Sequence, residues 1–141
     1  MPASQHIRDD AFLDRVISER FKGKYMSNTK WVQLLDKLIA TQTRILQCRV
    51  KLIWESGPAY RELLLHSNLT YGFHYYQNAV EGLITGRPAG WYAYKEIEWI
   101  EFPLDTPGGP QDLEGIESVL RSVGQLELEK DADSIRVWAY R

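Results

Sequence analysis

The segment from Trp91 to Pro103 constrains the fold more than any other part of the chain. Its thirteen residues hold five aromatic side chains and three carboxylates, and Pro103 ends it. Aromatic and β-branched enrichment of this kind predicts a β-strand. Strict alternation fails, however, because Trp99 and Ile100 are adjacent apolar residues and would point to opposite faces. We therefore expect either a β-bulge near Trp99 or Ile100, or a strand that is buried on both faces.

The carboxylates of this segment allow three interpretations. In the first, they form an acidic, aromatic-rimmed surface that docks a partner protein. In the second, two of them act as a general acid and a general base. In the third, they are structural and pair with basic side chains of a neighbouring strand, such as Arg49 and Lys51. The candidate partner-binding residues of the first interpretation are Glu96, Glu98, Glu101, Trp91, Tyr92 and Tyr94.

Three segments have the apolar spacing of helices. The first is expected over residues 10–22, with Asp10 as its cap. The second begins at Ser27 or Asn28, and its apolar stripe is typical of a core-facing helix. The third is expected over residues 111–123 and ends at Gly124. The stripe of the second helix consists of Trp31, Leu34, Leu35, Leu38 and Ile39.

Extended segments separate and follow these helices. Residues 45–55 alternate apolar with largely basic side chains, which is the pattern of an antiparallel strand with one solvated face. Residues 69–76 have strand composition, and residues 125–129 and 134–140 predict a β-hairpin. The three prolines and two glycines of residues 103–110 predict a loop.

Helices at both ends, with antiparallel strands between and after them, predict an α+β fold. We expect one mainly antiparallel sheet of about four to six strands, flanked by helices. A chain of 141 residues fits a single domain, which we expect over residues 10–141. Residues 1–9 are polar and are expected to form a frayed or disordered tail.

The charge balance and the cysteine content narrow the class of protein. With 17 basic and 19 acidic residues the net charge is −2, which disfavours a dedicated nucleic-acid binder. The single cysteine, Cys48, has no second cysteine to pair with and indicates a reducing compartment. The N-terminus lacks the apolar core of a signal peptide, and no apolar run approaches the roughly 20 residues of a membrane span. We therefore expect a cytoplasmic protein that does not associate with a membrane.

The sequence contains no familiar catalytic or metal-binding motif. His66 and His74 are eight positions apart, and neither His-Glu-x-x-His nor Cys-x-x-Cys occurs. Gly108 and Gly109 lack the Lys-Ser or Lys-Thr pair that completes a phosphate-binding loop. Cys48 lies on the apolar side of its expected strand, so we interpret it as a core residue rather than a nucleophile. We predict no metal and no cofactor.

Parts of the chain resemble a family of small bacterial proteins of unknown function. Residues 28–31 (Asn-Thr-Lys-Trp) match a helix start of that family, and residues 94–100 match its Tyr-Lys-Glu-Ile-Glu-Trp-Ile segment. Residues 140–141 match its closing Tyr-basic pair, so the resemblance covers about residues 27–141. It implies no catalytic residues, since none is established for the family. Small α+β cytoplasmic proteins of this kind are also similar in style to immunity proteins, which neutralise bacterial toxins.

These observations predict a non-enzymatic protein-binding module, such as an immunity protein whose partner is a toxin. A first alternative is a small hydrolase or ligand-binding domain built on His74, Tyr76 and a carboxylate. A second alternative is an RNA-binding module, in which basic residues lie beside aromatic stacking platforms. The sequence disfavours enzymatic activity, and it does not identify the partner or the oligomeric state.

Overall fold

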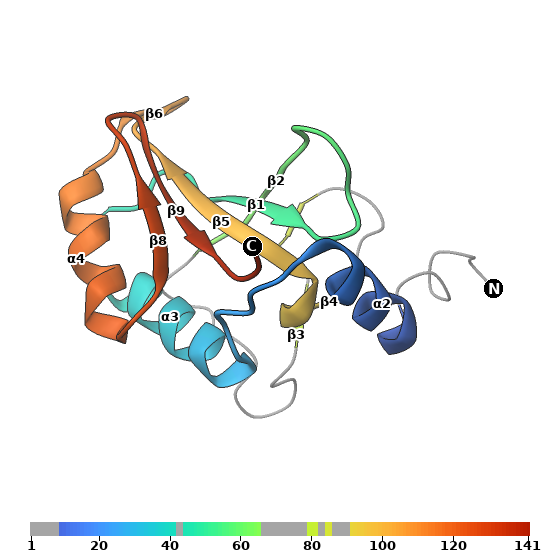
Figure 1. The fold of residues 1–141 in the computed structure, drawn as a ribbon. Helices are drawn as coiled ribbons and strands as arrows, with labels where there is room; N and C mark the ends of the chain where they lie inside the picture. Colours follow the sequence, from blue (N-terminus) through green and yellow to red (C-terminus); the bar gives the residue numbers. More distant parts are fainter. Residues whose placement is uncertain (1–8, 42–43, 66–78, 82–83, 86–90) are drawn as a thin grey trace.

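The computed structural model of the chain describes residues 9–41, 44–65, 79–81, 84–85 and 91–141. Over these residues the chain forms an α+β fold, in which three helices flank a five-stranded antiparallel sheet (Figure 1). The predicted fold class and the predicted size of the sheet are therefore confirmed. The strand expected at residues 69–76 lies outside the described residues.

The main sheet is antiparallel throughout. In spatial order its strands are β2 (Arg61–Glu62), β1 (Arg49–Leu52), β5 (Ile97–Pro103), β9 (Ser134–Trp138) and β8 (Glu127–Lys130). The longest strand, β5, is thus at the centre, with a neighbour on each side. Two small sheets pair β3 (Ala79–Glu81) with β4 (Trp91–Ala93), and β6 (Asp105–Thr106) with β7 (Gly109–Pro110).

The first two helices begin at side-chain caps that the sequence supplies. Helix α2 (Asp10–Arg20) begins after Asp9, and α3 (Asn28–Ala40) begins after Ser27. Each cap accepts a hydrogen bond from a backbone N–H of the first turn, at 2.8 Å in α2 and 3.1 Å in α3. The α2 cap is therefore one residue earlier than expected, whereas Ser27 was one of the two predicted caps.

In the described part of the chain, no helix is long and apolar enough to cross a membrane.

Helix α4 (Leu113–Val123) begins two residues later than predicted and ends, as predicted, at Gly124. Its cap is Asp112, whose carboxylate accepts a backbone N–H at 3.0 Å. Gln111 precedes the helix, and its side chain joins the end of β5 to the segment before β1. Its amide nitrogen donates to the Pro103 carbonyl at 2.6 Å, and its amide oxygen accepts a backbone N–H from the segment before β1 at 3.0 Å.

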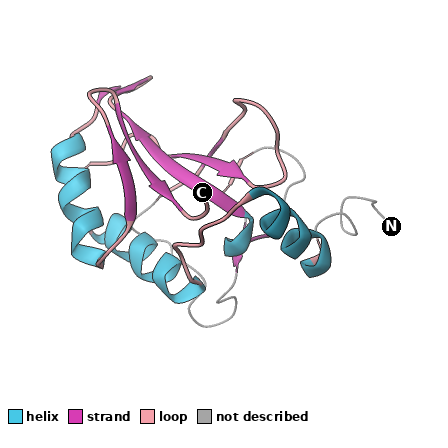
Figure 2. Cartoon of the chain, viewed as in Figure 1, coloured by secondary structure: helices cyan, strands magenta, loops and turns pink. Residues whose placement is uncertain are grey.

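The core lies between one face of the main sheet and the neighbouring helices α3 and α4. Figure 2 shows these two helices together on one side of the strands, whereas α2 lies apart from them at the right of the picture. The predicted stripe of α3 supplies Trp31, Leu34, Leu35 and Leu38, all at most 2% exposed. Alternate residues of β1, β5 and β9 face them, as the two-residue repeat of a strand requires. These buried sheet residues are Val50, Leu52, Ile100, Phe102, Ile135 and Val137.

The segment of residues 91–103 forms two strands rather than one. Strand β4 ends at Ala93, a 3₁₀ turn follows over Tyr94–Glu96, and β5 begins at Ile97. The Glu96 carboxylate closes the turn by accepting a hydrogen bond from the Ala93 N–H at 2.6 Å. The prediction of one continuous strand is therefore wrong, because a side-chain hydrogen bond satisfies the backbone where the sheet ladder would have continued.

The adjacent apolar residues Trp99 and Ile100 break the alternation of this segment, and the expected irregularity in the sheet is present. Strand β1 places Lys51 opposite Trp99 and Leu52 opposite Ile97, so the register passes over Glu98 as an extra residue. All seven residues of β5 are also buried. The structure thus confirms a bulge as well as burial on both faces, with the irregularity one residue before the expected position.

Three other sequence predictions can be compared with the structure. The strand expected over residues 45–55 is shorter, because only the residues of β1 pair in the sheet. The loop expected at residues 103–110 contains the β6–β7 hairpin, in which the Thr106 hydroxyl donates to the Gly109 carbonyl at 2.7 Å. The hairpin expected over residues 125–140 is confirmed as β8 and β9.

The end of α4 gives a first testable prediction. Gly124 has φ 135° and ψ −153°, a conformation that residues with a Cβ rarely adopt. We expect Gly124→Ala to lower the free energy of unfolding by about 1–3 kcal/mol, measured by urea denaturation. Gly108→Ala is the control, since a Cβ there would lie 3.7 Å from its nearest neighbour, an ordinary contact. Equal losses in the two variants would contradict the role of the backbone conformation.

Candidate functional site

The structure places the predicted partner-binding residues in the interior. The described side chains among them are buried: Glu96 is 2% exposed, Glu98 7%, Glu101 9%, and Tyr92 and Tyr94 0%. The Trp91 backbone lies in β4, and its side chain is outside the described part of the chain. The exposed acidic surface that we expected is therefore not formed by these residues. The reason is that β5, which carries two of the three acids, is the central strand of the sheet.

Glu96 serves the local backbone and a neighbouring ring. One carboxylate oxygen accepts a hydrogen bond from the Trp54 indole N–H at 2.9 Å, and the other accepts from the Ala93 N–H at 2.6 Å. A buried carboxylate is tolerated when hydrogen bonds replace those that it loses from water. Glu96 therefore fixes the turn between β4 and β5 and the position of Trp54 above it.

Glu98 lies at the bulge between two basic side chains. The Lys51 ammonium is 3.5 Å from its carboxylate, and the Arg20 guanidinium is 3.6 Å from the same oxygen. Arg20 also donates a hydrogen bond to the backbone carbonyl of Ile53, just beyond β1. The extra residue of the bulge thus helps to attach α2 to the end of the sheet.

Glu101 is paired with both neighbouring strands. On the β9 side, its Oε2 accepts hydrogen bonds from Nε and Nη2 of Arg136 at 3.0 and 2.8 Å. On the β1 side, its Oε1 lies 3.5 Å from Nη1 of Arg49. Arg49 and Lys51 are the two residues predicted from the sequence as possible cross-strand partners of these acids. That structural interpretation is confirmed.

Cation–π contacts extend the Glu101 ion pairs into a row on the sheet face opposite the core. The Arg136 guanidinium carbon is 4.0 Å from the centre of the Trp99 ring, and that of Arg49 is 4.6 Å from the centre of the Tyr60 ring. At the β9 end of the row, Arg141 lies 4.8 Å from a tryptophan ring of that strand. We call this row the arginine–aromatic ladder. It consists of Tyr60, Arg49, Glu101, Arg136, Trp99, Trp138 and Arg141.

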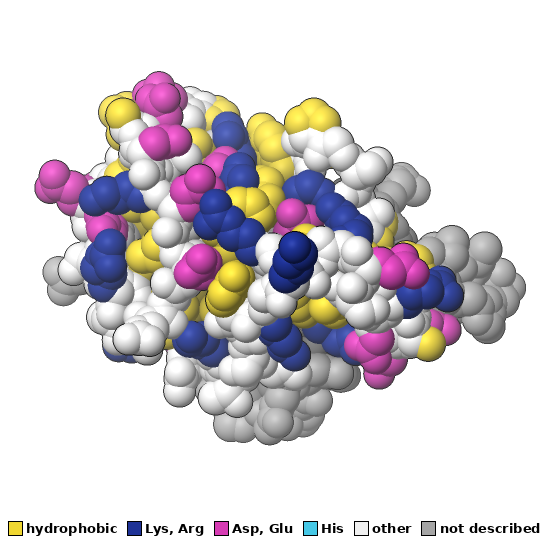
Figure 3. Space-filling model, viewed as in Figure 1, with side chains coloured by type: hydrophobic (Ala, Val, Ile, Leu, Met, Phe, Trp, Pro, Cys, Tyr) yellow, Lys and Arg dark blue, Asp and Glu magenta, His cyan; other side chains and the backbone are white. Residues whose placement is uncertain are grey.

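The ladder holds its carboxylate beneath its cations. The side chains of Arg49 and Arg136 are 27% and 28% exposed, whereas that of Glu101 is 11% exposed. At the β8 edge the charge is mixed, because Arg141 lies 3.8 Å from Glu129. Figure 3 shows basic side chains interleaved with apolar and acidic ones over the middle of the sheet. The exposed surface around Arg49 and Arg136 is thus basic and aromatic, whereas an acidic surface was predicted.

The ladder was not predicted from the sequence, although two local signals pointed to it. Arg136 and Trp138 are two residues apart in an expected strand and must share a face. The basic face of residues 45–55 was recognised as a source of partners for the acids and, in the RNA-binding alternative, as a contact surface, but Arg136 was not linked to it. Only the strand order shows that Glu101 lies between Arg49 and Arg136 and joins them into one row.

The alternative pocket lies outside the described residues. His74 and Tyr76 both fall in the range 66–78, so the hydrolase or ligand-binding alternative stays a prediction. Within the described ranges, no cluster of histidine, cysteine and acidic side chains is arranged to hold a metal ion.

Comparison with known proteins adds no assignment. No protein-family model, no curated protein and no solved structure matches the chain. The resemblance to a bacterial family of unknown function therefore stays a prediction.

The buried position of Glu96 gives a stability prediction. We expect Glu96→Ala to lower the free energy of unfolding by about 2–4 kcal/mol, because two partly buried donors are left unpaired, each at a cost toward the lower end of about 1–3 kcal/mol. Glu19→Ala, an exposed glutamate of α2, is the matched control and should change stability by about 0.5 kcal/mol or less. If chemical denaturation shows the two variants to be equally stable, the carboxylate does not hold the turn.

Cys48 gives a prediction about reactivity. Its side chain is 1% exposed, and burial, reinforced by the nearby Glu62 carboxylate, raises the pKa of the thiol. We expect the folded protein not to react with a chromogenic disulfide reagent at neutral pH, and to react with one equivalent once denaturant unfolds it. Rapid stoichiometric labelling of the folded protein would show that the thiol is accessible and the assignment to the core is wrong.

Proposed function

We propose that this protein is a non-enzymatic protein-binding module and that it binds an acidic surface of a partner protein through the arginine–aromatic ladder. The observation that supports this proposal is the difference in exposure along the ladder. Glu101 lies underneath, while the guanidinium groups of Arg49 and Arg136 remain partly open to solvent. Carboxylates of a partner would satisfy the N–H groups that face outward.

The ladder is also organised before a partner arrives. Two hydrogen bonds to Glu101 and the ring of Trp99 hold the Arg136 side chain in place. A freely rotating arginine carries about 2 kcal/mol of side-chain rotamer entropy, some of which it loses when a partner fixes it. Arginine, tryptophan and tyrosine are the residue types that most often dominate the energy of an interface. The composition and the rigidity of the ladder therefore both favour protein binding.

Neutralisation of a toxin is the form of protein binding that we propose. Such a role requires a surface that occludes the partner, and the open face of the sheet offers one. We place the protein in the cytoplasm, since its single cysteine is a buried free thiol, as is usual in a reducing compartment. The toxin would present carboxylates at the contact, the opposite sign to that expected from the acids of residues 91–103.

The proposal predicts that the exposed ends of the ladder are needed for partner binding. Tyr60 is 45% exposed and the Arg141 side chain 46% exposed, so changing them should leave the fold intact. We expect the double variant Tyr60→Ala/Arg141→Glu to weaken binding about tenfold or more, because it removes an aromatic anchor and reverses a charge. The partner is first captured from the native cell with the wild-type chain, purified, and titrated against each variant by calorimetry.

The control variant is Arg15→Glu, which makes the same charge reversal at an exposed position of α2. Thermal unfolding should show all three proteins folded. Equal binding by the double variant and the control would overturn the proposal. Capture of RNA in place of a protein, with an affinity that falls steeply as salt is raised, would also overturn it and would support the RNA-binding alternative.

A further inference from the structure

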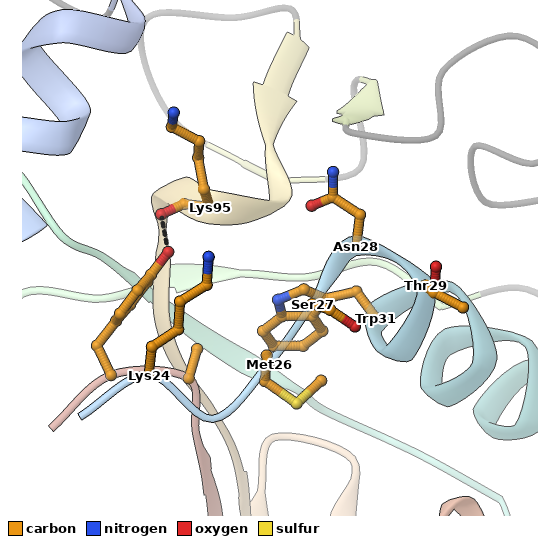
Figure 4. Close-up of a pocket in the computed structure, with 9 residues that line it drawn as sticks. Lys24, Met26, Ser27, Asn28, Thr29, Trp31 and Lys95 are labelled. Carbon is orange, nitrogen blue, oxygen red and sulfur yellow. Dashed lines mark hydrogen bonds between the residues drawn. The ribbon is translucent and has the colours of Figure 1, made fainter.

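A second feature, separate from the ladder, lies where α3 begins. A pocket of about 250 Å³ is enclosed by the start of this helix, the segment before it, the turn that precedes β5 and the end of the chain (Figure 4). Met26 and Trp31 supply its apolar wall, and Lys24 and Lys95 lie at its rim. The side chains of Ser27, Asn28 and Thr29 complete the lining on the helix side.

The helix start offers unpaired backbone donors. The N–H of Lys30 is capped by the Ser27 hydroxyl at 3.1 Å, but the N–H groups of Asn28 and Thr29 precede the first intrahelical hydrogen bond. The first turn of α3 contains no acidic residue, whereas the first turns of α2 and α4 each contain one. The positive end of the α3 dipole is therefore not neutralised by a carboxylate of its own helix.

The indole N–H of Trp31 is the group in this pocket that points most directly to a ligand. The residue is 2% exposed, and its N–H donates to no described residue. Figure 4 shows the nitrogen on the edge of the ring that faces Lys24. The indole nitrogen is not one of the fully buried, unpaired atoms of the described residues, so it reaches solvent through the pocket. An acceptor bound in the pocket would supply the missing partner.

The two lysines at the rim differ in their ion pairing. Lys95 is paired, with its ammonium 3.0 Å from both Asp10 and Asp14 of α2. Burial lowers the pKa of Lys95, but the hydrogen bonds to the two aspartates raise it more, so this lysine is cationic at neutral pH. Lys24 makes no ion pair with a described residue and is the uncompensated charge of the rim.

Backbone contacts hold this rim in position. Lys24 forms a bridge with Tyr140, and the next residue donates its N–H to the Ala139 carbonyl at 2.8 Å. The Tyr140 hydroxyl donates to the Lys95 carbonyl at 3.0 Å, and burial raises the pKa of this phenol to about 12, so it keeps its proton. The backbone at Lys24 and at Lys95 is thus held in place by contacts that do not depend on a ligand.

We propose that this pocket binds a phosphate group. The Lys24 ammonium, the Trp31 indole N–H and the free N–H groups at the start of α3 donate to its oxygens, whereas the charge of Lys95 is already offset by Asp10 and Asp14. A phosphate group suits a site with several donors and one lysine that has no ion pair, and helix N-termini commonly bind phosphate. The pocket is larger than phosphate alone, and its apolar wall leaves room for the organic part of a phosphomonoester. The ligand is therefore either free phosphate or a small phosphomonoester.

The test follows the indole and backbone N–H signals of the full chain by ¹⁵N NMR during titration with inorganic phosphate or phenyl phosphate. Sodium chloride at equal ionic strength is the reference. We expect saturable shifts of the Trp31 indole and of the Asn28 and Thr29 amides with phosphate and none with chloride. Tighter binding of phenyl phosphate identifies a phosphomonoester site, whereas equal affinities identify a site for the free anion.

Two variants separate a built site from general charge attraction. Lys24→Ala should weaken phosphate binding about tenfold, because it removes a charge-assisted hydrogen bond. Lys22→Ala removes an equal charge from an exposed position nearby and should leave binding unchanged. Trp31→Phe keeps the ring and removes the N–H, and it should also weaken binding. The absence of saturable shifts, or equal effects of Lys24→Ala and Lys22→Ala, would overturn the proposal.

Discussion

Burial of the central strand β5 on both faces is the constraint on which the rest of the structure depends. A strand in this position places its charged side chains where water cannot stabilise them. Glu98 and Glu101 are therefore neutralised by basic side chains from three other elements: α2, β1 and β9. These ion pairs add specificity to the apolar packing, because only one register places each carboxylate beside its partners. The bulge at Glu98 is part of the same solution, since it turns that carboxylate toward Lys51 and Arg20.

The pairing of these acids also decides the character of the open sheet face. Each carboxylate is shorter than the arginine that it binds, so the acid lies close to the sheet and the guanidinium extends over it. Aromatic rings beside the arginines then fix the guanidinium groups by cation–π contact. A strand that is rich in glutamate thereby produces a surface that is basic and aromatic around Arg49 and Arg136. The charge of a segment in the sequence is thus a poor guide to the charge that it presents.

The ladder and the pocket at α3 are opposite outcomes of the same rule for buried polar groups. In the ladder, internal partners satisfy Glu101, and the side chains of Arg49 and Arg136 stay 27% and 28% exposed. In the pocket, the Trp31 indole and the first N–H groups of the helix have no partner in the described part of the chain. The first arrangement suits a broad partner surface, and the second suits a small ligand with several acceptor oxygens.

The sequence by itself determined the local elements of this protein. Helical spacing placed α3, serine capping marked its start, and Gly124 marked the end of α4, because caps and stripes depend on residues within a few positions of one another. It also indicated that residues 91–103 could not form a simple two-faced strand. Only the tertiary structure decided that β5 is central, that its acids are buried, and that Arg49 and Arg136 meet over one carboxylate. The physical reason is that exposure and ion pairing depend on which strands become neighbours, and strand order is set by contacts between residues far apart in the chain.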